Sequence, residues 1–140
     1  MMIEATLNGQ PITVKPRTTI LDAAKAAGIQ IPTLCYLEKC QPIGACRVCV
    51  VELDGKRQLV AACSTMVDNG MNIQTNSARV RASRKMTLEL LLSEHDGECQ
   101  VCDRNHDCEL QHAASLMNIT EVTYEGERTK TQFDTSIPAL

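Results

Sequence analysis

The sequence predicts an α+β protein in which a small sheet unit with one helix is followed by a small helical unit. Two turn signals indicate the sheet unit. Asn8-Gly9 separates two segments in which apolar and polar residues alternate, and Asp54-Gly55 separates two apolar runs. After Ser77 the spacing of leucine and alanine becomes helical. A chain of 140 residues is long enough for one ordinary domain or two small ones, so both units fit within it.

The first unit is predicted to run in the order hairpin, helix, cysteine-rich loop, hairpin and strand. Thr19 is expected to cap the helix, with Asp22 three positions later and Gly28 as the stop signal. The second hairpin contains several valines, which are typical of strands. The expected strands are residues 3–7, 11–15, 46–53, 56–63 and 71–75, and the expected helix lies within residues 18–29.

The second unit is predicted to contain two helices joined by a loop that carries three cysteines. Ser77 can cap a helix over residues 78–95, in which Leu88, Leu91 and Leu92 share one face. The second helix is expected over residues 109–119, because its apolar residues follow the spacing i, i+3, i+4, i+7. The expected boundaries are residues 1–76 for the sheet unit, 77–120 for the helical unit and 121–140 for an extended polar tail.

A basic run occupies the first half of the long helix. Its members are Arg79, Arg81, Arg84 and Lys85. Most such runs are solvated faces, and we expect this one to face solvent, with docking of an acidic partner as the alternative.

The composition narrows the class of protein. Eight cysteines in a chain with one Phe, two Tyr and no Trp require an explanation other than packing. The N-terminus lacks the apolar core of a signal peptide, and no apolar stretch approaches the roughly 18 residues of a membrane span. A net charge of −3 gives no support for nucleic-acid binding. We therefore expect a cytoplasmic protein, with peripheral attachment to a membrane-bound complex as a second option, whose thiols bind metal instead of forming disulfides.

Five cysteines in the first unit compete for one four-ligand metal site. Cys46-x2-Cys49 is a short chelating loop at the start of the second hairpin, Cys35 lies in the preceding loop and Cys63 ends the returning strand. This arrangement can gather four thiolates at one end of a sheet. Cys40 is the fifth candidate. A CxxC pair alone also suits zinc or a redox dithiol, so the pair does not identify the metal.

The second unit offers three cysteines and needs a fourth ligand. The cysteines are spaced Cys99-x2-Cys102-x5-Cys108. The candidates for the fourth position are His95, His106, His112 and Cys40. If the long helix reaches His95, its ring lies on the leucine face and points to the interior. The tether of His106 to Cys108 is short, whereas His112 follows Cys108 by four residues on a helix and can face the site.

The first set resembles a known iron–sulfur module. The spacing Cys35-x10-Cys46-x2-Cys49-x13-Cys63, together with "CRVCVVEL" and "LVAACST", is similar to the plant-type [2Fe–2S] ferredoxin module. The version it resembles stands at the N-terminus of the large iron–sulfur subunit of respiratory complex I, and also in [FeFe]-hydrogenases and NAD-linked formate dehydrogenases. The resemblance implies a β-grasp fold and those four cysteines as ligands, and it assigns no role to Cys40.

The second set resembles the site that follows this module in the same family. The spacing His95-x3-Cys99-x2-Cys102-x5-Cys108, between "LELLLSEH" and "CELQ", is similar to a [4Fe–4S] site with one histidine and three cysteine ligands. The resemblance implies a small helical [4Fe–4S] domain after the β-grasp domain. It also implies a higher reduction potential than an all-thiolate site would have, because a neutral imidazole replaces one negative charge.

The two sites together predict an electron-transfer component without a catalytic site of its own. The chain contains no dinucleotide-binding or Walker motif. The resemblance implies partner subunits: a flavin-containing NAD(P)H-oxidising subunit on one side and a hydrogenase, formate dehydrogenase or quinone-reducing unit on the other. In that family the chain normally continues into further [4Fe–4S] modules, so this chain is either a short subunit or a fragment. The alternative from another class is a zinc-binding structural or regulatory protein.

Overall fold

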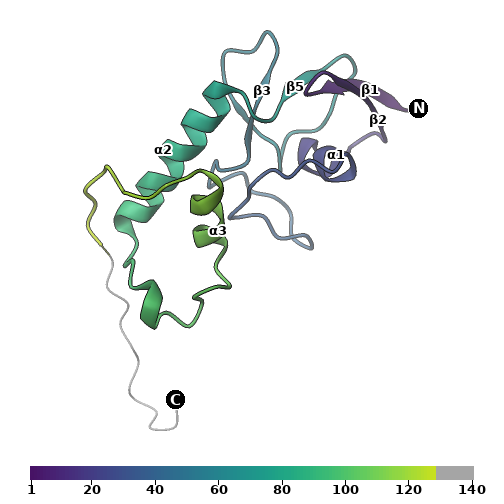
Figure 1. The fold of residues 1–140 in the computed structure, drawn as a ribbon. Coiled ribbons are helices and arrows are strands. Elements are labelled where there is room, and N and C mark those ends of the chain that lie inside the picture. Colours follow the sequence, from purple (N-terminus) through teal and green to yellow (C-terminus); the bar gives the residue numbers. More distant parts are fainter. Residues whose placement is uncertain (129–140) are drawn as a thin grey trace.

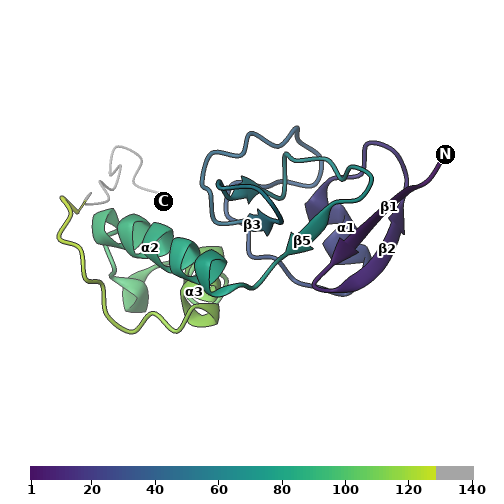
Figure 2. The same ribbon diagram turned by 90° about the horizontal axis from the view of Figure 1, so that it is seen from above.

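The computed structural model describes residues 1–128 and contains one mixed sheet and three α-helices (Figure 1). The sheet has the strand order β2-β1-β5-β3-β4. Its N-terminal hairpin lies at one side of the molecule, and α2 and α3 lie beside each other at the opposite side (Figure 2). The elements are β1 (Ile3–Leu7), β2 (Gln10–Val14), α1 (Ile20–Ala26), β3 (Val50–Leu53), β4 (Val60–Ala61), β5 (Asn72–Gln74), α2 (Ala78–Glu94), the 3-10 helix η1 (Cys99–Val101) and α3 (Glu109–Leu116).

The first hairpin forms as the sequence predicts. Asn8 and Gly9 have φ values of 50° and 83°, and positive φ at both central residues gives the turn that matches the twist of antiparallel strands. The turn pairs Leu7 with Gln10, so β2 begins one residue earlier than expected. This register places Ala5 and Leu7 on the buried face of the sheet.

The middle of the sheet joins the two hairpins through β5. This strand runs parallel to β1, with Thr6 opposite Asn72, and antiparallel to β3, with Leu53 opposite Ile73. The helix α1 is capped by Thr19, whose hydroxyl accepts from the backbone N–H of Asp22 at 3.1 Å. The order of strands and the helix that packs on the sheet agree with the expected β-grasp, so the predicted α+β class is confirmed.

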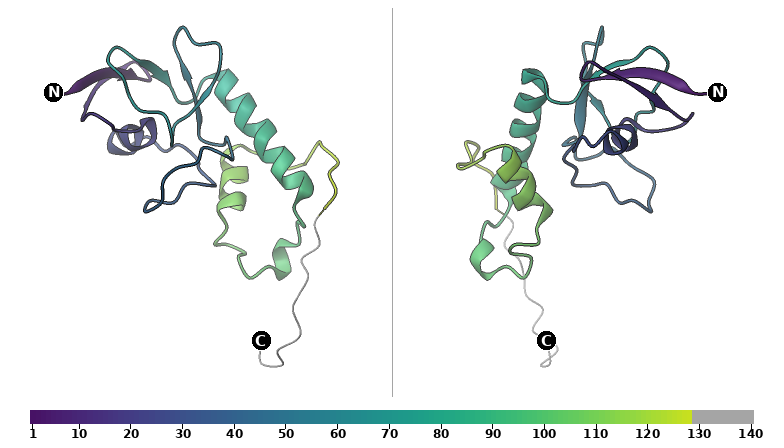
Figure 3. Two further views of the ribbon diagram at one scale, coloured as in Figure 1. Left: turned by 180° about the vertical axis from the view of Figure 1, so that it is seen from behind. Right: turned by 45° about the vertical axis from the view of Figure 1, so that its right-hand side comes forward.

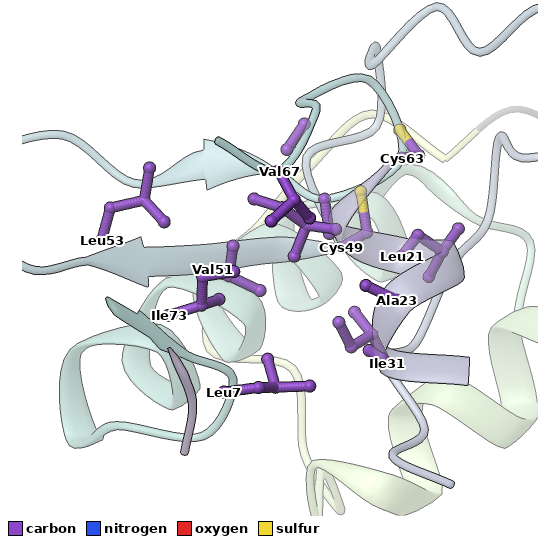
Figure 4. Close-up of a cluster of buried hydrophobic side chains, with 14 of the residues drawn as sticks. Leu7, Leu21, Ala23, Ile31, Cys49, Val51, Leu53, Cys63, Val67 and Ile73 are labelled. Carbon is purple, nitrogen blue, oxygen red and sulfur yellow. The ribbon is translucent and has the colours of Figure 1, made fainter. Parts of the chain in front are cut away.

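The main core lies between α1 and the sheet (Figure 4). Leu7 and Ile73 from the sheet and Ile20 from α1 are completely buried. Cys49 and Cys63 belong to the same core, and both are among the side chains drawn in Figure 4. The apolar packing therefore fixes two of the candidate ligands directly.

The second hairpin is shorter than the sequence predicts. Its strands β3 and β4 pair Val50 with Ala61 and leave Cys49 and Cys63 in the turns on either side. The expected strands over 46–53 and 56–63 were therefore too long at their cysteine ends. Within a strand, successive side chains point to opposite faces of the sheet. A cysteine just outside the strand does not have to follow this alternation.

The helical part packs on a second, smaller core. Val48, Leu88 from α2 and Ala113 from α3 form its buried centre. Ser77 caps α2 as predicted, because its hydroxyl accepts from the backbone N–H of Val80 at 3.2 Å. The leucine face was predicted only in part, since Leu88 is buried whereas Leu91 is exposed.

One residue of the basic run is not on the solvated face. Arg79, Arg81 and Lys85 are exposed, but Arg84 is buried. Arg84 lies four residues after Val80 and four before Leu88, and this spacing places all three on the inner side of the helix. The expectation that the whole run faces solvent was therefore wrong for Arg84.

Residues 121–128 contain no helix or strand and run back along α2 (Figure 3). The hydroxyl of Thr123 donates to a carboxylate oxygen of Glu89 at 3.2 Å, which ties this segment to the helix. The rest of the tail expected over 121–140 lies outside the described residues. Within residues 1–128, none of the helices combines the length and the apolar character that crossing a membrane requires.

Candidate metal centres

Four of the five cysteines in the first unit meet beside the second hairpin. The backbone N–H of Cys46 points at the sulfur of Cys35 at 3.5 Å. Cys49 and Cys63 interact through their side chains, and Cys49 also interacts electrostatically with Cys46. These contacts link all four residues into one group, as the sequence predicts for a four-thiolate site.

Backbone N–H groups lie around Cys35 and Cys46, the two partly buried cysteines of this group. Burial alone would raise the pKa of Cys46, but hydrogen bonds from the backbone at Val48, Cys35 and Leu34, together with one from the Cys35 side chain, outweigh burial and place this pKa below its ordinary value of 9.0. The thiolate form is the one that binds metal. The loop therefore supplies the backbone donors that a negatively charged sulfur centre requires.

The inner pair is held in an apolar environment. Cys49 and Cys63 are only 2% and 1% exposed. Burial raises the pKa of the Cys49 thiol to about 11, and the neighbouring Cys63 and Cys46 add to the increase through their charge, while a backbone hydrogen bond at Cys63 opposes it. Metal must therefore displace a proton from Cys49 when it binds.

Gly44 allows the ligand loop to pass close to the hairpin. Its φ is +64°, and a Cβ at this position would lie 3.0 Å from the hydroxyl oxygen of Ser64 and 3.7 Å from the Cβ of Ala61. The backbone conformation and the close approach both favour glycine. A side chain at this position of the loop before Cys46 would therefore need a strained backbone and a small shift of Ser64.

Cys40 does not take part in this group. Its side chain is exposed, and the hydrogen bond that the structure gives it is from its backbone N–H to the carbonyl oxygen of Leu37 at 3.0 Å. No contact joins it to the other cysteines among those that the structure gives for the described residues. The geometry thus separates one spare cysteine from the four that converge.

Arg84 is a charged residue beside this group, and the sequence analysis placed it on the solvated face instead. Its Nη2 donates to the carbonyl oxygen of Val50 at 2.7 Å, and its side chain interacts electrostatically with Cys49. Burial lowers the pKa of Arg84 to about 10, and the Cys49 thiolate opposes that decrease. Its spacing from Val80 and Leu88 was the available signal, but the surrounding exposed arginines and lysine obscured it.

The second set of candidate ligands lines one cavity. His95, Cys99, Cys102 and Cys108 surround a space of about 270 Å³ together with the apolar side chains of Leu92, Leu110 and Val122. The three cysteines come from η1, the residue after it and the N-cap of α3. Cys99 begins η1, and the other three ligands directly flank the end of a helix, so the connecting loops can bend around a common centre.

His95 lies at the end of α2 and not inside it. The helix stops at Glu94, and His95 has the extended conformation φ −79°, ψ 144° of a C-cap. The helix expected over residues 78–95 is therefore one residue too long, and the condition under which the ring would continue the leucine face is not met. His95 is exposed and lines the cavity. The backbone N–H of Gly97 donates to Nδ1 of His95 at 3.1 Å. A neutral imidazole that binds iron has one nitrogen on the metal and a proton on the other, so this hydrogen bond has to break when His95 acts as a ligand.

The other two histidines lie elsewhere. His106 and His112 line a separate hollow of about 420 Å³ on the other side of Cys108. His106 has a φ of +67°, and its backbone N–H donates to the side chain of Gln111 at 3.3 Å. Of the three histidines, His95 alone shares a cavity with all three cysteines.

The donor sets suit clusters better than single ions. Within residues 1–128, no three His, Cys, Asp or Glu side chains converge closely enough to hold one metal ion. Ligands of a two-iron or four-iron cluster are distributed over several metal atoms and stand further apart. Thiolate ligands, backbone donors and a buried cation fit a [2Fe–2S] centre at the first set, and one imidazole with three thiolates around a cavity fits a [4Fe–4S] centre at the second.

Two family models match the two parts of the chain in the same order. Residues 1–78 match the model of a 2Fe-2S iron-sulfur cluster binding domain. Residues 84–123 match the model of the NADH-ubiquinone oxidoreductase-G iron-sulfur binding region. The two models indicate one [2Fe–2S] and one [4Fe–4S] cluster, and nothing in the comparisons favours the zinc-binding alternative.

Three relatives share this region as a small part of much longer proteins. The chain is 42% identical over 135 residues to the NADPH-Fe(3+) oxidoreductase subunit alpha of Geobacter sulfurreducens, which covers 95% of this chain and 16% of that protein. It is 45% identical over 130 residues to the NADP-reducing hydrogenase subunit HndD of Solidesulfovibrio fructosivorans, covering 89% and 22%. It is 40% identical over 110 residues to the G 2 subunit of the NADH-quinone oxidoreductase of Rhizobium meliloti, covering 79% and 13%.

A solved structure has the same fold over nearly the whole chain. A chain in the crystal structure of an NAD+-reducing [NiFe]-hydrogenase in the H2-reduced state superposes with a TM-score of 0.87 at 32% identity. The match covers 97% of this chain and 57% of that chain. The three relatives are named as subunits of oxidoreductases or of a hydrogenase.

Proposed function

This chain belongs to the family of 2Fe-2S iron–sulfur cluster binding domains, and on that premise we propose that it relays single electrons between a flavin- and NAD(P)H-linked subunit and a catalytic unit. The observation that carries the proposal is the pair of donor sets. Each set is gathered at one place in the structure, and the two follow one another in the order of the two matched iron–sulfur regions.

We assign Cys35, Cys46, Cys49 and Cys63 as ligands of the [2Fe–2S] cluster. The contacts among these four residues and the exposure of Cys40 support this assignment. We assign His95, Cys99, Cys102 and Cys108 as ligands of the [4Fe–4S] cluster, which is supported by their shared cavity.

When bound, such clusters accept and release one electron at a time. The chain supplies the surroundings in which this happens. Buried Cys49 and Cys63 keep water from the inner side of the first site, and the N–H of Cys46 is positioned to stabilise negative charge on sulfur. Leu92, Leu110 and Val122 form the apolar wall of the second site. We propose no catalytic residue for this chain.

The partner subunits are inferred from the relatives. Their names describe NADPH-, NADP- or NADH-linked oxidoreductases and hydrogenases. We propose that a flavin-containing subunit that oxidises NAD(P)H stands on one side of this chain and a hydrogenase, formate dehydrogenase or complex I type unit on the other. The chain spans less than a quarter of each of these relatives. We therefore also propose that it works together with further electron-transfer or catalytic domains.

We propose residues 1–76 and 77–120 as the two cluster domains. Supporting this division, β5 ends at Gln74 and α2 begins at Ala78, so the junction lies between a strand and a capped helix. The cytoplasmic location inferred from the cysteine content stays a prediction.

The test is to purify the chain without air and to measure its iron, its zinc and its EPR spectrum after reduction with dithionite. One two-iron and one four-iron cluster give about six irons per chain and two reducible signals. A colourless, EPR-silent protein that contains two zinc ions would contradict the proposal. As a matched control, the same preparation of Cys49→Ser is expected to keep the four-iron signal and to lose or change the two-iron signal.

A further inference from the structure

Arg84 is a buried cation between the two units. Only 3% of its surface is exposed, although it lies on a helix whose neighbouring basic residues face solvent. It belongs to α2, within the region that matches the second iron–sulfur model, yet its hydrogen bond reaches Val50 at the start of β3. The second unit therefore inserts a positive charge into the first.

This charge is incompletely compensated by the protein. The described residues provide no carboxylate within ion-pair distance of Arg84, and its Nε is buried without a hydrogen-bond partner. Burying a charge without a counter-charge strongly destabilises a fold. A guanidinium group does not lose its proton under ordinary conditions, so it cannot avoid this penalty by becoming neutral.

The negative charge that faces Arg84 comes from the first ligand group. Arg84 interacts electrostatically with Cys49, and the residue that accepts its hydrogen bond, Val50, follows Cys49 directly. Four thiolate ligands give a [2Fe–2S] site a net negative charge, and one-electron reduction adds a further negative charge. A fixed cation nearby stabilises the reduced state more than the oxidised state.

We propose that Arg84 is a positioning and charge-compensating residue that raises the reduction potential of the [2Fe–2S] site. The proposal rests on the proposed function, because it requires the cluster at Cys35, Cys46, Cys49 and Cys63. It assigns to the second unit a role in setting the redox properties of the first. The exposed Arg79, Arg81 and Lys85 do not share this role, because solvent screens their charges.

The experiment compares three substitutions in the full 140-residue chain loaded with clusters under anaerobic conditions. Arg84→Lys keeps the charge, Arg84→Gln keeps a hydrogen-bond donor without the charge, and Arg84→Met removes both. The midpoint potential of the two-iron signal is measured by EPR-monitored titration with dithionite and redox mediators. Arg81→Gln serves as the control, since Arg81 is exposed on the same helix.

Arg84→Gln and Arg84→Met are expected to lower the equilibrium constant for reduction about tenfold, the scale that Coulomb's law gives at the effective dielectric constant of a protein interior. Tenfold corresponds to about 59 mV for a one-electron couple. Arg84→Lys and Arg81→Gln are expected to stay close to the wild-type potential. Loss of the cluster in both neutral variants, with the cluster retained in Arg84→Lys, also supports a requirement for charge.

Three results would overturn the inference: an unchanged potential in both neutral variants, an equal decrease in Arg84→Lys, or loss of the cluster in all three variants. Each of them would leave Arg84 with a packing or hydrogen-bonding role alone. Absence of a two-iron signal in the wild-type chain is a different result, because it contradicts the proposed function itself.

Discussion

Val48 and Cys49 are neighbours in the chain, but their side chains enter different cores. Cys49 packs in the core between α1 and the sheet, whereas Val48 packs against α2 and α3. Both side chains are almost completely buried. The turn that carries a proposed cluster ligand therefore also joins the two units, so a change in the helical packing is expected to reach the ligand group.

Leu88→Ala tests the packing of α2 against the turn that carries Val48 and Cys49. Leu88 is fully buried against Val48, and its truncation is expected to decrease the free energy of unfolding by about 2–5 kcal/mol through lost burial and a remaining cavity. The measurement is denaturant unfolding of the anaerobic, cluster-loaded chain, followed by circular dichroism. Leu90→Ala is the matched control, because Leu90 lies on the same helix but is 49% exposed, and it is expected to change stability by about 0.5 kcal/mol or less. Equal effects of the two variants would contradict the packing role.

Serine substitutions distinguish the spare cysteine from the ligands. Cys40→Ser is expected to keep both clusters, because Cys40 is exposed and apart from the ligand group. Cys35→Ser is expected to lose or perturb the two-iron signal, because the sulfur of Cys35 accepts from the N–H of Cys46 within that group. Iron content and EPR spectra of the two variants provide the comparison. The assignment is wrong if Cys40→Ser loses the two-iron signal and Cys35→Ser keeps it.

His95→Cys changes the charge at the second site. A thiolate in place of a neutral imidazole adds one negative charge, so the midpoint potential of the four-iron signal is expected to decrease. His112→Gln is the control, since His112 lies in a separate hollow and should leave that potential unchanged. Redox titration followed by EPR measures both. An unchanged or higher potential in His95→Cys would count against His95 as a ligand.

Gly44→Ala tests the shape of the ligand loop. The new methyl group would meet the hydroxyl of Ser64 at 3.0 Å in a backbone conformation that already disfavours side chains, so the content of the two-iron cluster is expected to fall. Gly55→Ala is matched in conformation, with a φ of +74°, but has nothing within 4 Å. It is expected to destabilise the fold by about 1–2 kcal/mol and to keep its cluster. A normal two-iron content in Gly44→Ala would show that the loop tolerates the contact.

Local signals predicted most of the fold because each of them acts within a few residues. Asn8-Gly9, the Thr19 cap and the Ser77 cap all form as expected. The ends of the second hairpin were predicted too far toward the cysteines, because apolar runs do not show where strand pairing stops. The spacing of the cysteines also assigned the two donor sets to the parts of the chain that the two family models match.

The burial of Arg84 and the position of His95 were not predicted, because they depend on contacts that cannot be seen in the sequence. Arg84 looked like its solvated neighbours, and only the packing of α2 against β3 buries it. The long helix was expected to include His95, which would have placed its ring on the leucine face, but α2 ends one residue before it. Both differences concern side chains whose surroundings come from distant segments, which periodicity in one segment cannot reveal.

The short connection between β5 and α2 has a consequence for the timing of electron flow. Ser77 caps α2 through the N–H of Val80 and also donates to a carboxylate oxygen of Glu52 on β3 at 2.5 Å, so the junction is tied to both units. Tunnelling rates depend steeply on the distance between donor and acceptor. A junction held in this way is expected to limit changes in the spacing of the two donor sets, and so to limit changes in the rate of electron transfer between them.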